Sequence, residues 1–157
     1  MGGHAFDTPP AFTPDGRLVA FLQTNGPQNG YIEVHGLPDG ARVCRSEKPT
    51  DCSCLALSPD GRTVAWGLCR SEPLVHLLDV ATGKERHTFA GHLGGVQTLT
   101  FSADGKKLVS GGTDATLLVW DMTAPPAAPG SGQPEKPISP RKAPPFHQWR
   151  PTGTARG

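Results

Sequence analysis

The feature that most constrains this sequence is a nine-residue motif that occurs three times at almost constant spacing. The copies read FTPDGRLVA at Phe12–Ala20, LSPDGRTVA at Leu57–Ala65 and FSADGKKLV at Phe101–Val109, and their aspartates lie 45 and 44 residues apart. A second pair of turns, which end at Gly40 and Gly83, keeps nearly the same period of 43 residues. Two independent markers with one period indicate an array of similar units of about 44 residues.

Each unit is expected to fold into four short β-strands. The Asp-Gly turns combine an aspartate that can hydrogen-bond its own backbone with a glycine that tolerates positive φ. Runs of strand length flank these turns, and no segment shows helical periodicity. The expected strands include Leu18–Leu22, Tyr31–Val34, Ala41–Ser46, Cys54–Leu57, Leu74–Leu78, Lys84–Phe89, Leu99–Phe101 and Leu117–Trp120. The pattern therefore predicts an all-β protein built from repeated antiparallel sheets.

Composition changes after Met122. Nine of the 17 prolines and five of the 15 Lys and Arg residues fall within residues 123–157, against a single acidic residue, Glu135. Proline removes a backbone donor and fixes φ, so this stretch cannot build a regular helix or sheet. We therefore expect an ordered domain at 1–122 and a Pro-rich, basic, disordered tail at 123–157. A net charge of +1 gives no reason to expect nucleic-acid binding, and no apolar run approaches the roughly 20 residues of a membrane-spanning helix.

The third unit carries the most specific motif. Gly91-His92 opens it and Trp120-Asp121 closes its third strand. This pattern resembles a WD repeat, the unit of WD-repeat β-propellers, and all of residues 1–122 share the period. The resemblance implies an open partial propeller of three consecutive four-stranded antiparallel blades, at about 1–47, 48–90 and 91–122, with the last blade incomplete. In the first two units His35 and Leu78 stand where the third has Trp120.

The same resemblance implies that His92, Ser110, Asp114 and Trp120 form a hydrogen-bonded chain within one blade, with Thr113 as an alternative hydroxyl to Ser110. A buried indole, hydroxyl and imidazole each need a partner, which gives such a chain a structural purpose. Histidine, serine and aspartate are also the components of a hydrolase triad, but the sequence has no Gly-x-Ser-x-Gly elbow. We therefore expect a structural network, no catalytic residue and no enzyme activity.

The four cysteines are Cys44, Cys52, Cys54 and Cys69, and they include no Cys-x-x-Cys pair. Two interpretations stay open, namely small buried apolar residues or a zinc site completed by His87. We favour the first and expect neither a metal nor a cofactor. The spacing does not suggest a disulfide framework, which favours a reducing, cytoplasmic location.

These expectations point to a protein–protein interaction scaffold. In WD repeats the residue before the turn aspartate often faces a partner, and the matching positions here are Thr113, Ser71 and Gln28. A propeller closes with about 4–8 blades, so three blades indicate a fragment or truncated product of a larger propeller, or a chain that self-associates to complete the ring. Neither outer blade shows a recognisable cap. The alternative function is the C-terminal sensor or scaffold part of a larger multidomain enzyme, such as a protein kinase. The expected partners are other proteins, and neither a membrane nor a nucleic acid is expected.

Overall fold

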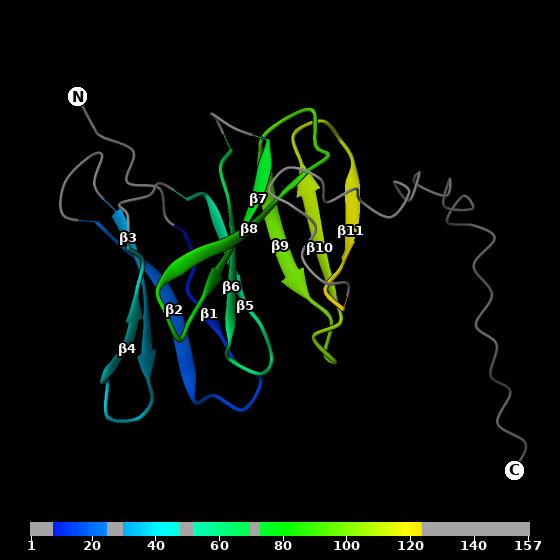
Figure 1. Cartoon of the computed structure of the whole chain (residues 1–157). Coiled ribbons are helices and arrows are strands. Elements are labelled where there is room, and N and C mark those ends of the chain that lie inside the picture. The colour runs from blue at the N-terminus through cyan, green and yellow to red at the C-terminus, as the bar shows by residue number, and fades with distance from the viewer. Residues whose placement is uncertain (1–7, 25–29, 48–51, 70–72, 124–157) are drawn as a thin grey trace, which may run out of the picture.

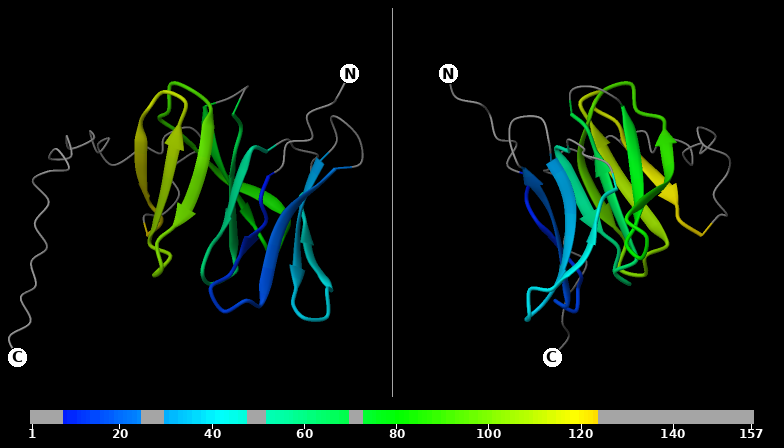
Figure 2. Two further views of the ribbon diagram at one scale, coloured as in Figure 1. Left: turned by 180° about the vertical axis from the view of Figure 1, so that it is seen from behind. Right: turned by 60° about the vertical axis from the view of Figure 1, so that its left-hand side comes forward.

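The computed structural model describes residues 8–24, 30–47, 52–69 and 73–123. Within these residues, eleven β-strands form three antiparallel sheets and there is no helix, which confirms the all-β class. The sheets stand side by side in chain order (Figure 1), and the view from behind shows the same order (Figure 2). No helix in the described ranges could span a membrane.

Each sheet is a meander in which a strand pairs with the next strand along the chain. The first sheet contains β1 (Ala11–Phe12), β2 (Leu18–Thr24), β3 (Gly30–Gly36) and β4 (Arg42–Arg45). The second sheet contains β5 (Cys54–Leu57), β6 (Thr63–Gly67), β7 (Leu74–Asp79) and β8 (Lys84–Ala90). The third sheet contains β9 (Val96–Phe101), β10 (Lys107–Gly112) and β11 (Leu117–Asp121). The sheets are therefore blade-like, and the third has three strands within the described residues.

The aspartate turns are built alike in the three sheets. The hydroxyls of Thr13, Ser58 and Ser102 donate to the turn aspartates at 2.6, 2.6 and 2.5 Å. Each of these hydroxyl oxygens also accepts the backbone N–H that starts the next strand, at 3.0, 2.9 and 3.0 Å. The glycine after each aspartate has a φ of 67 to 69°, which a residue with a side chain rarely adopts. Every contact in these turns is local, so the motif alone is sufficient to form them.

Strand pairing places the three units in one common register. The equivalent cross-strand pairs are Val19–His35, Val64–Leu78 and Leu108–Trp120. His35 and Leu78 therefore occupy the position of Trp120, as the sequence predicts. The first two units keep the backbone arrangement of the third even though they lack its tryptophan.

Two apolar layers hold the sheets together. The first layer lies between the first and second sheets and includes the fully buried Ile32 and Val64. The second lies between the second and third sheets and includes Val75 and Trp120. Phe89 of β8 stacks on Trp120 with 4.8 Å between ring centroids. The fourth strand of the second sheet thereby contributes to the packing of the third, and burial of these side chains supplies the main stabilisation of the stack.

Candidate functional site

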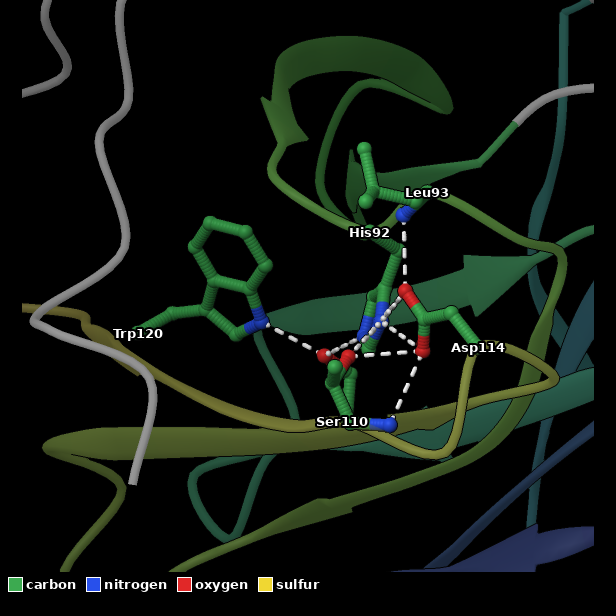
Figure 3. Close-up of polar contacts among 6 residues, drawn as sticks. His92, Leu93, Ser110, Asp114 and Trp120 are labelled. Carbon is green, nitrogen blue, oxygen red and sulfur yellow. Dashed lines mark hydrogen bonds and ion pairs between the residues drawn. The ribbon is translucent and has the colours of Figure 1, made fainter. Parts of the chain in front are cut away.

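Four side chains from four segments meet within the third sheet (Figure 3). Trp120 lies on β11, Ser110 on the neighbouring β10, His92 between β8 and β9, and Asp114 in the turn between β10 and β11. Trp120 is 1% exposed, and His92 and Ser110 are also buried. Pairing of β9 with β10 and of β10 with β11 brings these segments together.

The hydroxyl of Ser110 joins the indole to the imidazole. Trp120 Nε1–H donates to Ser110 Oγ at 2.8 Å, and Ser110 Oγ lies 2.7 Å from His92 Nε2. Because an indole can only donate, Ser110 accepts from Trp120 and donates its own hydrogen to His92 Nε2. The proton on His92 Nδ1 then points toward Thr116 Oγ1 at 3.0 Å and Asp114 at 3.3 Å. We assign this tautomer because it gives every polar atom of the buried chain a partner.

Asp114 ties this chain to the loop before β9. Its carboxylate accepts the backbone N–H of Leu93 at 2.7 Å, the N–H of Thr116 at 3.0 Å and the hydroxyl of Thr116 at 2.6 Å. Burial alone would raise the pKa of Asp114, but these donors outweigh it and hold the pKa well below its ordinary value. A Cβ atom at Gly112 would lie 2.6 Å from His92 Nδ1 and 2.7 Å from Asp114 Oδ1, so the network requires glycine there.

Comparison with known proteins gives the family of this arrangement. The family model described as "WD domain, G-beta repeat" matches residues 83–121, which include the whole chain from His92 to Trp120. The chain belongs to the WD-repeat family. Its three sheets are accordingly WD-repeat blades, and we call them the first, second and third blades.

Several curated proteins are similar to this WD-repeat chain. It is 31% identical over 113 residues to the pre-rRNA-processing protein IPI3 of Mycosarcoma maydis, which covers 72% of this chain and 18% of that protein. It is 35% identical over 74 residues to WD repeat-containing protein 18 of Homo sapiens, covering 47% of this chain and 16% of the relative. It is 38% identical over 73 residues to the target of rapamycin complex subunit wat1 of Schizosaccharomyces pombe, covering 45% and 22%. The chain therefore spans less than a quarter of each of these relatives.

The structure brings together all four residues that the WD motif indicates. Ser110 is the bridging hydroxyl, and Thr113 lies outside the chain with its backbone N–H donating to the carbonyl of Gly95 at 2.9 Å. Thr116 contributes a second hydroxyl that the motif analysis missed. Its signal in the sequence is a threonine two residues after Asp114, on the same turn, where its hydroxyl reaches back to the carboxylate.

The buried position of this chain limits what it can do chemically. The His92 side chain is 0% exposed, and Ser110 is equally enclosed, so a substrate has no access to the hydroxyl. The Ser110 oxygen already accepts the indole N–H, which occupies the atom that would act as a nucleophile. The geometry therefore connects the strands of the WD-repeat blade and fixes the loops that precede and follow it.

The second blade is joined differently. Trp66 takes the place of Ser110 and pairs across the sheet with His76, and the two rings stack with 4.7 Å between centroids. Trp66 Nε1 has no hydrogen-bond partner. Ring stacking here replaces the polar chain of the third blade.

The cysteines take the positions of small apolar residues. All four are free thiols, and Cys44, Cys52 and Cys54 are buried. Burial raises the pKa of Cys54 to about 12. The ring of His87 packs edge-on against Phe89 at 4.6 Å. Among residues 8–24, 30–47, 52–69 and 73–123, no group of three His, Cys, Asp or Glu side chains could hold a metal ion.

One exposed surface adjoins the buried chain. Thr113, which the sequence predicts to face a partner, is exposed in the turn between β10 and β11, whereas Ser71 and Gln28 lie outside the described residues. Leu93, which the sequence analysis missed, is 91% exposed. Its backbone N–H is held by Asp114 while its side chain points to solvent (Figure 3). No local pattern marks Leu93, because its exposure depends on how the loop is anchored.

Proposed function

We propose that the chain is a protein–protein interaction scaffold whose contact surface includes Leu93 and Thr113. The observation that carries this proposal is the contrast between the backbone and the side chain of Leu93. Its N–H is fixed by the low-pKa carboxylate of Asp114, while the leucine side chain is 91% exposed. An apolar side chain on a fixed loop loses little conformational freedom when a partner covers it, which favours binding.

The names of the relatives support a role in assemblies. One similar protein is a target of rapamycin complex subunit, and another is a pre-rRNA-processing protein. We infer from them that this chain also works by holding other proteins together. The partners we propose are proteins, with no membrane and no nucleic acid.

We infer that the scaffold is non-catalytic and carries no cofactor. The histidine and serine that could form a triad are buried and fully engaged with Trp120 and Asp114, which supports a structural role for them. The four free thiols support a reducing, cytoplasmic location.

We also infer that the three blades are part of a larger propeller. A closed ring needs about 4–8 blades, and each relative named above is several times longer than the segment it shares with this chain. Further blades could come from more polypeptide of the same protein, from a second copy or from another chain. No feature of the described residues favours the alternative of a larger multidomain enzyme over a scaffold.

Proximity labelling in cells with the full chain tests the contact surface. Leu93→Arg should remove most of the labelled neighbours without changing the melting temperature, because the side chain makes no buried contact. The matched control is Ala103→Arg, which places the same residue in the exposed turn between β9 and β10, at the opposite end of the blade. Identical labelled proteins for the wild type and both variants would contradict the proposal.

A further inference from the structure

Each blade presents the same three positions toward the blade that follows it. Strand pairing makes these sets equivalent: Ala20, Ile32 and Val34; Ala65, Val75 and Leu77; Val109, Leu117 and Val119. The next blade covers the first two sets, and their members are at most 3% exposed. All nine residues are aliphatic, so the third blade carries the same packing surface as the other two.

In the third blade this surface is uncovered. Leu117 is 46% exposed, and Val109 and Val119 are half-buried. The outer edge of β11 is also unpaired within the described residues, whereas β3 and β7 each pair with a fourth strand. The third blade therefore continues the two established interfaces but has no described neighbour on that side.

The outer face of the first blade has the opposite chemistry. Glu33 and His35 occupy the positions of Leu118 and Trp120 in the third blade. These side chains alternate with Ile32 and Val34 and so point away from the second blade. Two charged or polar groups thus replace the two largest apolar side chains of the equivalent surface.

Glu33 is buried at the centre of a polar cluster. Its carboxylate lies 2.9 Å from His35 Nε2, 3.4 Å from Arg42 Nη1 and 3.8 Å from Arg45 Nε. The amide nitrogen of Gln23, in the orientation that satisfies both of its polar atoms, donates to the same carboxylate at 2.8 Å. The carboxylate is therefore surrounded by donors from β2, β3 and β4.

His35 closes this cluster. Its Nδ1 lies 2.9 Å from the carbonyl of Gly40, and its Nε2 faces Glu33 at 2.9 Å. Both neighbours are acceptors, so the ring satisfies both when it is doubly protonated. The hydrogen bond to Glu33 raises the pKa of His35 in agreement with this geometry. A sheet packed on this face would remove the remaining water from a charged cluster without supplying further hydrogen bonds, which is unfavourable.

We propose that the stack accepts new blades at one end only: the outer face of the third blade docks a further β-sheet with large apolar side chains, and the Glu33 cluster closes the first blade. The occupant we infer is a blade with leucine or tryptophan at the two positions of Glu33 and His35. A second copy of this chain in head-to-tail order does not fit, because it would press Leu117 and Val119 onto the charged cluster. The sequence analysis found no cap at either end, because the cluster is assembled by pairing across three strands. This inference goes beyond the proposed contact surface at Leu93 and stands or fails separately.

Sedimentation velocity of the full chain tests the direction of stacking. Replacing the polar pair by apolar residues, in the double variant Glu33→Leu/His35→Leu, should supply the missing complementary face and shift the chain from monomer to dimer or larger species. Adding Leu117→Lys to this variant should restore the monomer. A folded double variant that stays monomeric, or an association that Leu117→Lys does not reverse, would overturn the proposal. Wild-type association through its own third blade, abolished by Leu117→Lys, would also overturn it because the occupant would then be a second copy.

Binding of the dye ANS to the otherwise wild-type chain provides a readout that does not depend on the double variant. Leu117→Lys should remove most of the dye fluorescence. The matched control is Val43→Lys on the first blade, because Val43 is similarly exposed, at 52% against 46% for Leu117. The control should retain the fluorescence. Equal loss in the two variants, or no loss in Leu117→Lys, would contradict an apolar docking face on the third blade.

Discussion

Replacing Ser110 by alanine removes the hydroxyl that joins Trp120 to His92. The substitution is small and introduces no clash, because alanine fits within the space of serine. It leaves the indole N–H of Trp120 and Nε2 of His92 without their partner at 2.8 and 2.7 Å. Both atoms belong to buried residues, so water cannot replace the lost hydroxyl without opening the blade.

The magnitude follows from these two orphaned groups. A buried polar group without a partner costs about 1–3 kcal/mol, and two such groups give an expected loss of about 2–4 kcal/mol in the free energy of unfolding once partial relaxation is allowed. Single domains are stable by only about 5–15 kcal/mol, so the loss is a large fraction of the total. The variant should fold but unfold at a much lower urea concentration.

Equilibrium urea unfolding followed by far-UV circular dichroism measures this loss. The control is Thr100→Val, which removes an exposed hydroxyl from the same sheet with little change in shape. In a double-mutant cycle, Trp120→Phe should cost less in the Ser110→Ala background than in the wild type, because the orphaned N–H is removed with the indole. A loss below about 0.5 kcal/mol for Ser110→Ala, equal to that of the control, would refute the bridging role.

Three further predictions concern backbone packing, acid stability and thiol reactivity. Gly95→Ala should destabilise the fold more than Gly16→Ala in the same urea assay, because its Cβ would collide with the backbone carbonyl of Cys69, whereas Gly16 has open space and only the strain of φ 67°, about 1–2 kcal/mol. The stability contributed by Asp114 should be fully present above its ordinary pKa of 3.8 and decrease as the pH falls below it, since its folded pKa is lower; Asp114→Asn should remove this part of the acid dependence of the melting temperature. At pH 8, iodoacetamide followed by mass spectrometry should label the half-buried Cys69 before Cys54, whose pKa is about 12; early labelling of Cys54 would contradict its burial.

Much of the fold is predictable because it rests on short-range chemistry. The turn at Asp104 needs only Ser102, the aspartate and the following glycine, and the same three residue types form the other two turns. The period of these turns then sets the number and order of the strands. The network from His92 to Trp120 is predictable for a related reason, because its members lie at fixed distances within one recognisable motif.

The sequence alone thus determined the repeat, its all-β units and the residues of the polar network. Tertiary structure decided what each surface offers: the addition of Thr116 to the network, the exposure of Leu93 and the burial of Glu33 among Arg42 and Arg45. These features depend on which side chains meet across strands and on which faces another sheet covers. Alternation along a strand shows that two faces exist, but only the packed sheets show which face is enclosed and whether its polar groups find partners.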